Sequence, residues 1–178
     1  MSVPARATAL TSGDFDGDGV TDVAFSTVVD GKPAVCAYSA NSDSMTMRSC
    51  WGPEAWWGEG KPAPDAAAVE GFGVSLAAGD LDGDGKDEIL VASASGIVVL
   101  THHGAGFTSD STSFTATAIP GSFGSRVAMI HPGRPTKAKW AVYGADAKSI
   151  NIFTGTEMTQ KIDVSKDETI MSVGVSIR

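Results

Sequence analysis

Two stretches of this sequence, GDFDGDGVTDVAFST (residues 13–27) and GDLDGDGKDEILVAS (residues 79–93), align with each other without a gap. Each begins with a short, acidic, glycine-rich loop and continues into a segment rich in β-branched and other apolar residues. Such a segment favours a buried β-strand over a helix. Because the same pattern occurs twice, we interpret the chain as a set of internal repeats.

A third, altered copy follows the first two. FGSRVAMI (123–130) resembles FGVSLAA (72–78), which precedes the second acidic loop, and WAVYGA (140–145) resembles the strand that follows such a loop. Between them HPGRPTKAK (131–139) replaces the acidic residues. IMSVGVSI (170–177) resembles the opening strand of a fourth copy. The architecture is therefore expected to persist where the acidic side chains are lost.

Each copy is predicted to form four short antiparallel strands joined by tight turns, which is typical of a blade of a β-propeller. The opening strands of the second and third copies are expected at 72–79 and 123–130. We expect an all-β fold, namely a partial or open β-propeller of about three four-stranded blades. The predicted parts are a first blade at about 6–50, a Trp-rich connector at 51–71, a second blade at about 72–119, a third blade at about 123–163 and a strand of a further blade at 170–177.

The composition restricts the classes of partner. Of the 178 residues 42% are hydrophobic, which excludes a disordered chain. The net charge of −8 argues against nucleic acid or an anionic membrane as a partner. Purely apolar runs such as residues 97–100 are too short for membrane insertion, and MSVPARATAL (1–10) contains no hydrophobic signal core.

The two acidic loops carry carboxylates at loop positions 1, 3, 5 and 9 and a glycine at position 6. Calcium takes about six to eight oxygen ligands, a carbonyl at position 7 commonly among them, whereas magnesium prefers a rigid octahedral site. The alternative is a pair of polar turns, but four like charges would repel one another without a counter-ion. The predicted calcium ligands are Asp14, Asp16, Asp18, the Val20 carbonyl and Asp22 in the first loop, and Asp80, Asp82, Asp84, the Lys86 carbonyl and Glu88 in the second.

An EF-hand begins with the same acidic spacing but needs flanking helices and a Glu at loop position 12. That position holds Phe25 in the first loop and Val91 in the second. Both loops also lead into segments whose composition suits strands. The sequence therefore disfavours an EF-hand.

Cys36 and Cys50 flank a segment with the polar turn 41–43 near its middle. We expect them to face each other across a hairpin, at a separation that suits a disulfide. A disulfide would indicate an oxidising compartment. The alternative is a pair of buried free thiols.

Three of the four tryptophans, Trp51, Trp56 and Trp57, lie close together in a turn-rich segment. Clustered indoles can form a platform for a sugar ring or a protein ligand, and the alternative is that they cap the core between blades. His102 and His103 are expected to be ordinary loop residues, because neighbours on a strand point to opposite faces and do not converge on one metal. No nucleophile elbow, phosphate-binding loop or zinc-protease motif is present, so we expect no catalysis.

The segment FGVSLAAGDLDGDGKDEILVAS (72–93) resembles the FG-GAP repeat of the integrin α-subunit N-terminal β-propeller and its relatives. It contains the FG strand, the calcium loop and the following strand of that family. The first copy keeps the loop but has Arg6 and Ala7 where the FG pair is expected. The third copy keeps Phe123 and Gly124 but lacks the calcium ligands.

The resemblance implies blades around a channel, with two structural Ca²⁺ sites on one face and ligand contacts from other loops. The implied function is a non-catalytic, calcium-stabilised module for adhesion or protein recognition, extracellular or at the cell surface. The alternatives are a carbohydrate-binding, lectin-like propeller that uses the tryptophans, and an accessory domain of a secreted carbohydrate-active enzyme. Three blades leave open edges, so self-association or the remainder of a longer chain is expected to complete the propeller.

Overall fold

The computed structural model describes residues 8–29, 31–41, 44–52, 71–93, 96–103, 114–121, 124–133, 136–144 and 149–164. These residues form twelve β-strands and no helix. Accordingly, none of the described residues belongs to a helix long and apolar enough to cross a membrane. The predicted strand at 170–177 and most of the predicted connector lie outside the described residues.

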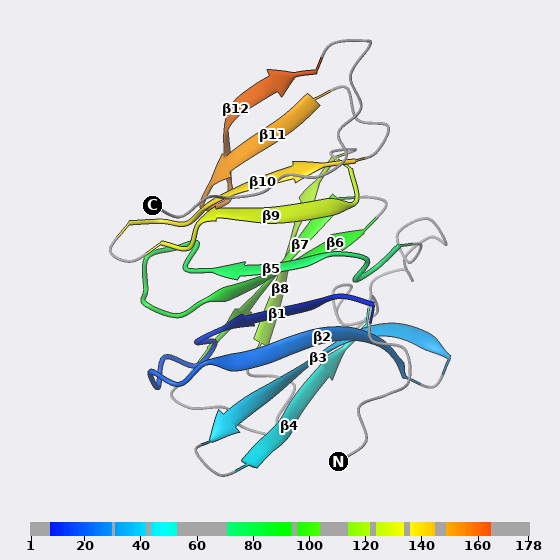
Figure 1. Ribbon diagram of the computed structural model, residues 1–178, viewed down its shortest axis with the longest axis vertical. Coiled ribbons are helices and arrows are strands. Elements are labelled where there is room, and N and C mark those ends of the chain that lie inside the picture. Colours follow the sequence, from blue (N-terminus) through cyan, green and yellow to red (C-terminus); the bar gives the residue numbers. More distant parts are fainter. Residues whose placement is uncertain are drawn as a thin grey trace.

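The strands form three sheets, each of four consecutive antiparallel strands (Figure 1). The first contains β1 (Leu10–Gly13), β2 (Asp22–Val29), β3 (Lys32–Asn41) and β4 (Ser44–Trp51). The second contains β5 (Leu76–Gly79), β6 (Glu88–Ser93), β7 (Gly96–His102) and β8 (Phe114–Pro120). The third contains β9 (Arg126–His131), β10 (Lys139–Tyr143), β11 (Ser149–Thr154) and β12 (Glu157–Asp163). The predicted all-β fold of four-stranded antiparallel blades is confirmed.

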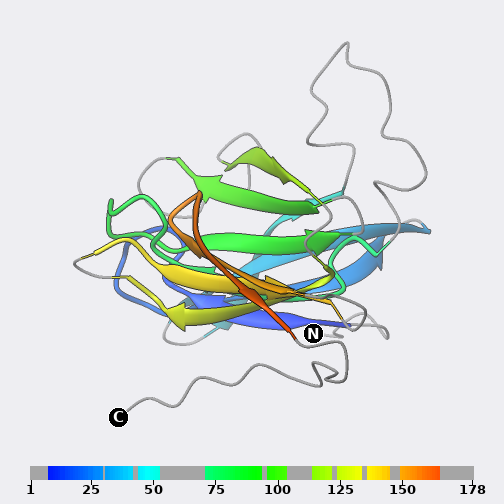
Figure 2. The same cartoon turned by 90° about the horizontal axis from the view of Figure 1, so that it is seen from above.

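The opening strands of the three blades lie next to one another, because β1 contacts β5 and β5 contacts β9 (Figure 1). Viewed along the long axis of the molecule, the three sheets lie over one another (Figure 2). They do not close into a ring. The loops that follow β1, β5 and β9 lie along the same edge of this stack (Figure 1).

The core consists of two apolar layers, one on each face of the second blade. Side chains alternate between the faces of a strand, so Ile89 and Val91 of β6 pack against the first blade, while Leu90 and Ala92 pack against the third. All six residues of β6 are buried for this reason. A strand covered on both faces needs an unbroken apolar run, which explains the composition of residues 89–92.

The FG pair of the second blade forms a turn and not the expected start of a strand. Gly73 has φ +73°, a conformation that suits glycine, and its N–H donates to the Ala92 carbonyl at 2.9 Å. A Cβ at Gly73 would lie 2.7 Å from the Cβ of Ser26 in the first blade. The turn thus places Phe72 in the core, and β5 begins only at Leu76. In the third blade β9 likewise begins only at Arg126.

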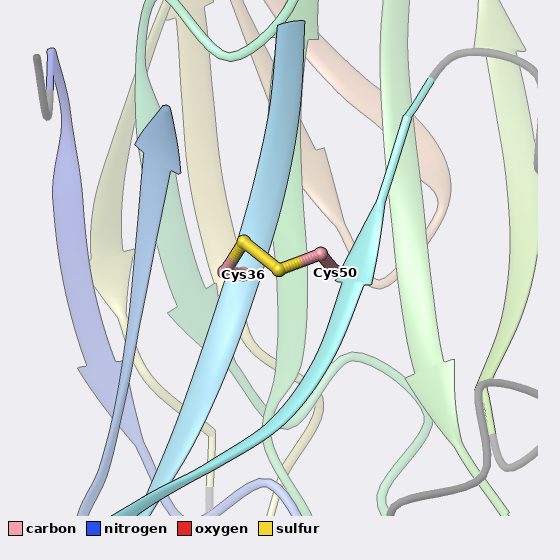
Figure 3. The surroundings of a disulfide bond; sticks show 2 residues. All are labelled: Cys36 and Cys50. Atoms are coloured by element: carbon pink, nitrogen blue, oxygen red, sulfur yellow. A yellow bond between two sulfur atoms is a disulfide. The ribbon is translucent and has the colours of Figure 1, made fainter. Parts of the chain in front are cut away.

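The predicted disulfide is present in the first blade (Figure 3). Cys36 of β3 and Cys50 of β4 are direct partners in the strand register, with a Cα–Cα distance of 4.0 Å. The alternative of two free thiols is therefore excluded. The bond joins the neighbouring strands β3 and β4, the last two of the blade.

Candidate metal centres

Each acidic loop connects the opening strand of a blade to its second strand, from β1 to β2 and from β5 to β6. The loops are anchored at position 2 by the buried side chains of Phe15 and Leu81. At position 6, Gly19 and Gly85 have φ of 83° and 92°. An L side chain rarely adopts that backbone, so glycine is required there for the turn itself.

In the first loop, the backbone is wound around the carboxylate of Asp14. Its Oδ1 accepts the Gly17 N–H at 2.8 Å and its Oδ2 accepts the Gly19 N–H at 3.0 Å. The Oδ1 atoms of Asp16 and Asp18 each accept the backbone N–H two residues further on, at 3.1 and 2.7 Å. These bonds turn successive carboxylates toward the inside of the loop.

The second loop repeats this pattern bond for bond. Asp80 accepts the N–H groups of Gly83 and Gly85 at 2.6 and 3.1 Å. Asp82 and Asp84 again accept the backbone N–H two residues further on, at 3.0 and 2.8 Å. Two loops far apart in sequence thus adopt the same conformation because the same side chains stand at the same positions.

The carboxylate at position 9 returns from the second strand to the start of the loop. Asp22 accepts the Phe15 N–H at 3.1 Å, and Oε2 of Glu88 accepts the Leu81 N–H at 2.7 Å. Both acidic residues are buried. The other carboxylate oxygen of Glu88, Oε1, is also buried and has no hydrogen-bond partner among the described residues.

Burial, and to a smaller extent the charges of the neighbouring aspartates Asp82, Asp84 and Asp80, raise the pKa of Glu88 to about 8. The hydrogen bond from Leu81 acts in the opposite direction and lowers it. A carboxylate in this position is costly to ionise unless a cation lies beside it.

The structure brings together three of the predicted carboxylates in each loop. One oxygen from each of Asp14, Asp16 and Asp18 lies within 4.8 Å of the others, and the same holds for Asp80, Asp82 and Glu88. Asp22 and Asp84 lie in the same loops outside these groups. The donors are all oxygen, and the second group includes Glu88, whose Oε1 has no hydrogen-bond partner among the described residues. This donor set fits a hard divalent cation. The carbonyls of Val20 and Lys86 stay predicted ligands.

The second acidic loop lies within a segment that matches a known family of protein repeats. The FG-GAP repeat model matches residues 72–108. This segment is similar to an FG-GAP repeat. The matched residues contain the turn at Phe72, the second acidic loop and strands β5, β6 and β7. The match confirms the resemblance to the FG-GAP family that the sequence of this segment indicated. A search of curated proteins found no match to the chain.

The third blade shows what replaces the acidic loop of the first two blades. His131, the last residue of β9, occupies the position that Asp80 has after β5 in the second blade. The Nδ1 atom of His131 accepts the Gly133 N–H at 3.1 Å. A histidine therefore stands in place of the first carboxylate, but it accepts the N–H two residues further on and not those three and five residues further on. The segment supplies no carboxylate at that position, in agreement with the predicted loss of ligands.

Of the two interpretations of the clustered tryptophans, a ligand platform or a cap on the core, Trp51 fits the second. This residue ends β4 and is only 3% exposed. Its ring packs on Phe114 of the second blade, at a centroid distance of 4.3 Å. The side chain points into the layer between the first two blades because β4 extends to this residue, so Trp51 caps the core. Trp56 and Trp57 lie outside the described residues.

The expectation for His102 is wrong. His102 is the last residue of β7, is buried, and packs edge-on against Phe114 at 4.8 Å. Burial lowers its pKa, with a smaller contribution in the same direction from the charge of Lys86. His103 is exposed, and its Nε2 lies 2.6 Å from Oγ1 of Thr115. The strand is longer than the sequence suggested because β8 pairs with it up to this point.

Proposed function

We propose that this chain is a calcium-stabilised β-propeller module that recognises a protein ligand and has no catalytic role. The similarity of residues 72–108 to an FG-GAP repeat supports a protein-interaction module built on propeller blades. The repeated geometry of the two acidic loops supports calcium as the ion that stabilises it.

The observation that carries the calcium proposal is the buried Glu88, whose Oε1 has no hydrogen-bond partner among the described residues and which lies beside three aspartates. Like charges this close strongly disfavour ionisation in the absence of a counter-charge. Calcium supplies that charge and accepts oxygen ligands from a flexible loop.

Calcium would be held by one cluster of residues in each loop. Within each blade the ligands come from the loop and from the first residue of the second strand. The ion would therefore fix the opening strand against the second strand and contribute to stability by binding only the folded state. The ligands would be Asp14, Asp16, Asp18, Asp22 and the Val20 carbonyl, and Asp80, Asp82, Asp84, Glu88 and the Lys86 carbonyl.

The disulfide between Cys36 and Cys50 supports an oxidising environment. We therefore place the module outside the cell or at the cell surface, where millimolar calcium also suits loops of modest affinity. Adhesion or a related recognition event is the role that this setting favours.

The test of the calcium proposal is calorimetric titration of metal-stripped protein, with thermal melts in EDTA and in calcium. We expect two sites and a higher melting temperature in calcium than in equimolar magnesium. The variant Asp82→Asn should lose one site. The control Asp163→Asn alters a carboxylate that pairs with Lys161 at the surface and should retain both. No heat and an unchanged melting temperature would refute the proposal.

Protein recognition is tested separately, by probing an array of secreted and cell-surface proteins and a glycan array with the calcium-loaded chain. We expect a protein to be bound in calcium and released in EDTA. Binding confined to glycans would overturn protein recognition in favour of a lectin.

A further inference from the structure

The two acidic loops are bonded directly to each other across the interface between the first and second blades. The Asp14 N–H donates to Oδ2 of Asp87 at 2.9 Å. In return the Asp87 N–H donates to the Asp14 carbonyl at 2.8 Å. Asp14 opens the first loop, while Asp87 lies in the second loop between Lys86 and Glu88. Asp87 of the second loop thus forms two hydrogen bonds with Asp14, the first residue of the first loop.

The two loops approach so closely that little room is left for adjustment. A Cβ at Gly13 would lie 2.8 Å from Oδ2 of Asp87 and 2.9 Å from its Cβ. A Cβ at Gly17 would lie 3.1 Å from Cγ of Lys86. Any change in the backbone around Asp87 is therefore transmitted to the first loop rather than absorbed by empty space.

The second interface between blades is built differently. There the Asp80 N–H donates to the Pro132 carbonyl at 2.8 Å, and the Asp80 carbonyl accepts the Ala138 N–H. Both partners belong to the blade that lacks an acidic loop. Among the described residues, a hydrogen bond from the backbone of one acidic loop to a side chain of another occurs only at the first interface.

We propose that Asp87 is a positioning residue that couples the two calcium loops, so that calcium in either loop raises the affinity of the other. This inference rests on the proposed calcium function. Lys86 and Glu88, the neighbours of Asp87, are predicted ligands of the second ion. Binding there fixes the backbone on both sides of Asp87 and aims its carboxylate at the Asp14 N–H. Asp14 then presents its own carboxylate to the first ion.

The coupling is reciprocal, because the effect of one ligand on the affinity for a second equals the reverse effect. It needs no large movement, only a reduction in the conformational freedom that the second ion would otherwise have to remove. Asp87 itself contacts neither ion in this arrangement. Its role is to transmit order between the loops.

The test is a double-mutant cycle followed by calcium calorimetry. Asp82→Asn removes a ligand of the second site, and the affinity of the first site is then compared with that in the wild-type protein. We expect a loss of about 5-fold or more, the lower end of typical coupling. In the Asp87→Ala background the same comparison should give a ratio near one.

Two further variants separate coupling from a general structural role. Asp87→Asn keeps an oxygen that can accept the Asp14 N–H, and we expect it to restore most of the coupling. Thr21→Ala changes the equivalent position of the first loop, which is exposed, and should leave the coupling factor unchanged.

The outcomes distinguish this inference from the function on which it rests. Two sites with independent affinities in the wild-type protein would overturn the coupling and leave the calcium function intact, as would coupling that persists in Asp87→Ala. Absence of calcium binding would overturn both. If Asp87→Ala does not fold, hydrogen exchange at the Asp14 amide decides. Its protection in calcium should fall when Asp82→Asn removes the second site, and unchanged protection would refute the coupling.

Discussion

Replacing Glu88 by Gln is expected to stabilise the calcium-free protein and to destabilise the calcium-loaded protein relative to the wild type. In the absence of calcium, burial beside three aspartates raises the pKa of Glu88 from 4.5 to about 8. The folded state therefore holds a proton that the unfolded chain releases above pH 4.5. Stability consequently falls as the pH rises from about 4.5 and levels off above about 8.

The size of this effect follows from the pKa difference. Because the folded state keeps Glu88 protonated, the free energy of unfolding of the calcium-free protein falls by about 1.4 kcal/mol for each pH unit above 4.5. At pH 7 this loss amounts to about 3 kcal/mol. Gln cannot ionise, yet its side-chain oxygen can still accept the Leu81 N–H. Glu88→Gln should raise the melting temperature in EDTA at pH 7 by up to about 6–12 °C. In calcium the order reverses, because Gln is a weaker ligand.

The measurement is thermal melting followed by near-ultraviolet circular dichroism from pH 5 to 9, in EDTA and in calcium. Glu157→Gln, on an exposed strand residue, serves as the matched control and should melt like the wild type. A wild-type protein whose melting temperature in EDTA does not fall between pH 5 and 8 would refute the reasoning. So would a Glu88→Gln variant that is not stabilised in EDTA.

Three further predictions concern the fold. Removing the disulfide with the pair Cys36→Ala and Cys50→Ala should cost about 3 kcal/mol, because it closes a short loop in the unfolded chain, and a urea titration under matched calcium measures it. His102→Gln should remove one contribution that lowers stability on acidification and opposes that of Glu88: the lowered pKa of His102 keeps it neutral while the unfolded chain takes up a proton below about pH 6.5, and equal slopes for both proteins between pH 5 and 7 would contradict this. Leu90→Ala opens a cavity between the second and third blades and should cost about 2–5 kcal/mol, whereas Val29→Ala at an exposed site should change the urea midpoint little.

The features that the sequence predicted correctly depend on residues close together in the chain. The acidic loops are organised by hydrogen bonds within nine consecutive residues, so their spacing alone indicates the conformation. Cys36 and Cys50 belong to one hairpin, whose turn brings them near each other, and a one-residue shift in register between Ala37 and Tyr38 makes them direct partners. Repetition of the pattern then indicated the blades.

The features that the sequence did not reveal depend on contacts between blades. The sequence left two interpretations of Trp51 open, and its packing on Phe114, more than sixty residues away, decides between them. Residue 73 must be a glycine because Ser26 of the first blade leaves no room for a side chain there. Asp87 stands next to a predicted ligand, but nothing in its own loop indicates that it bonds to Asp14. The nearest signal is that Thr21 holds the same position in the first loop.

The apolar run of β6 has a consequence for handling this protein. Residues 89–92 are shielded on one side by the first blade and on the other by the third. A short apolar segment of high β-propensity is a strong aggregation sequence once it is exposed. Loosening of either outer blade therefore uncovers such a segment even while the middle blade keeps its own strands paired. Solubility during purification should thus depend on how firmly the outer blades stay attached, and calcium chelators should be avoided until that has been measured.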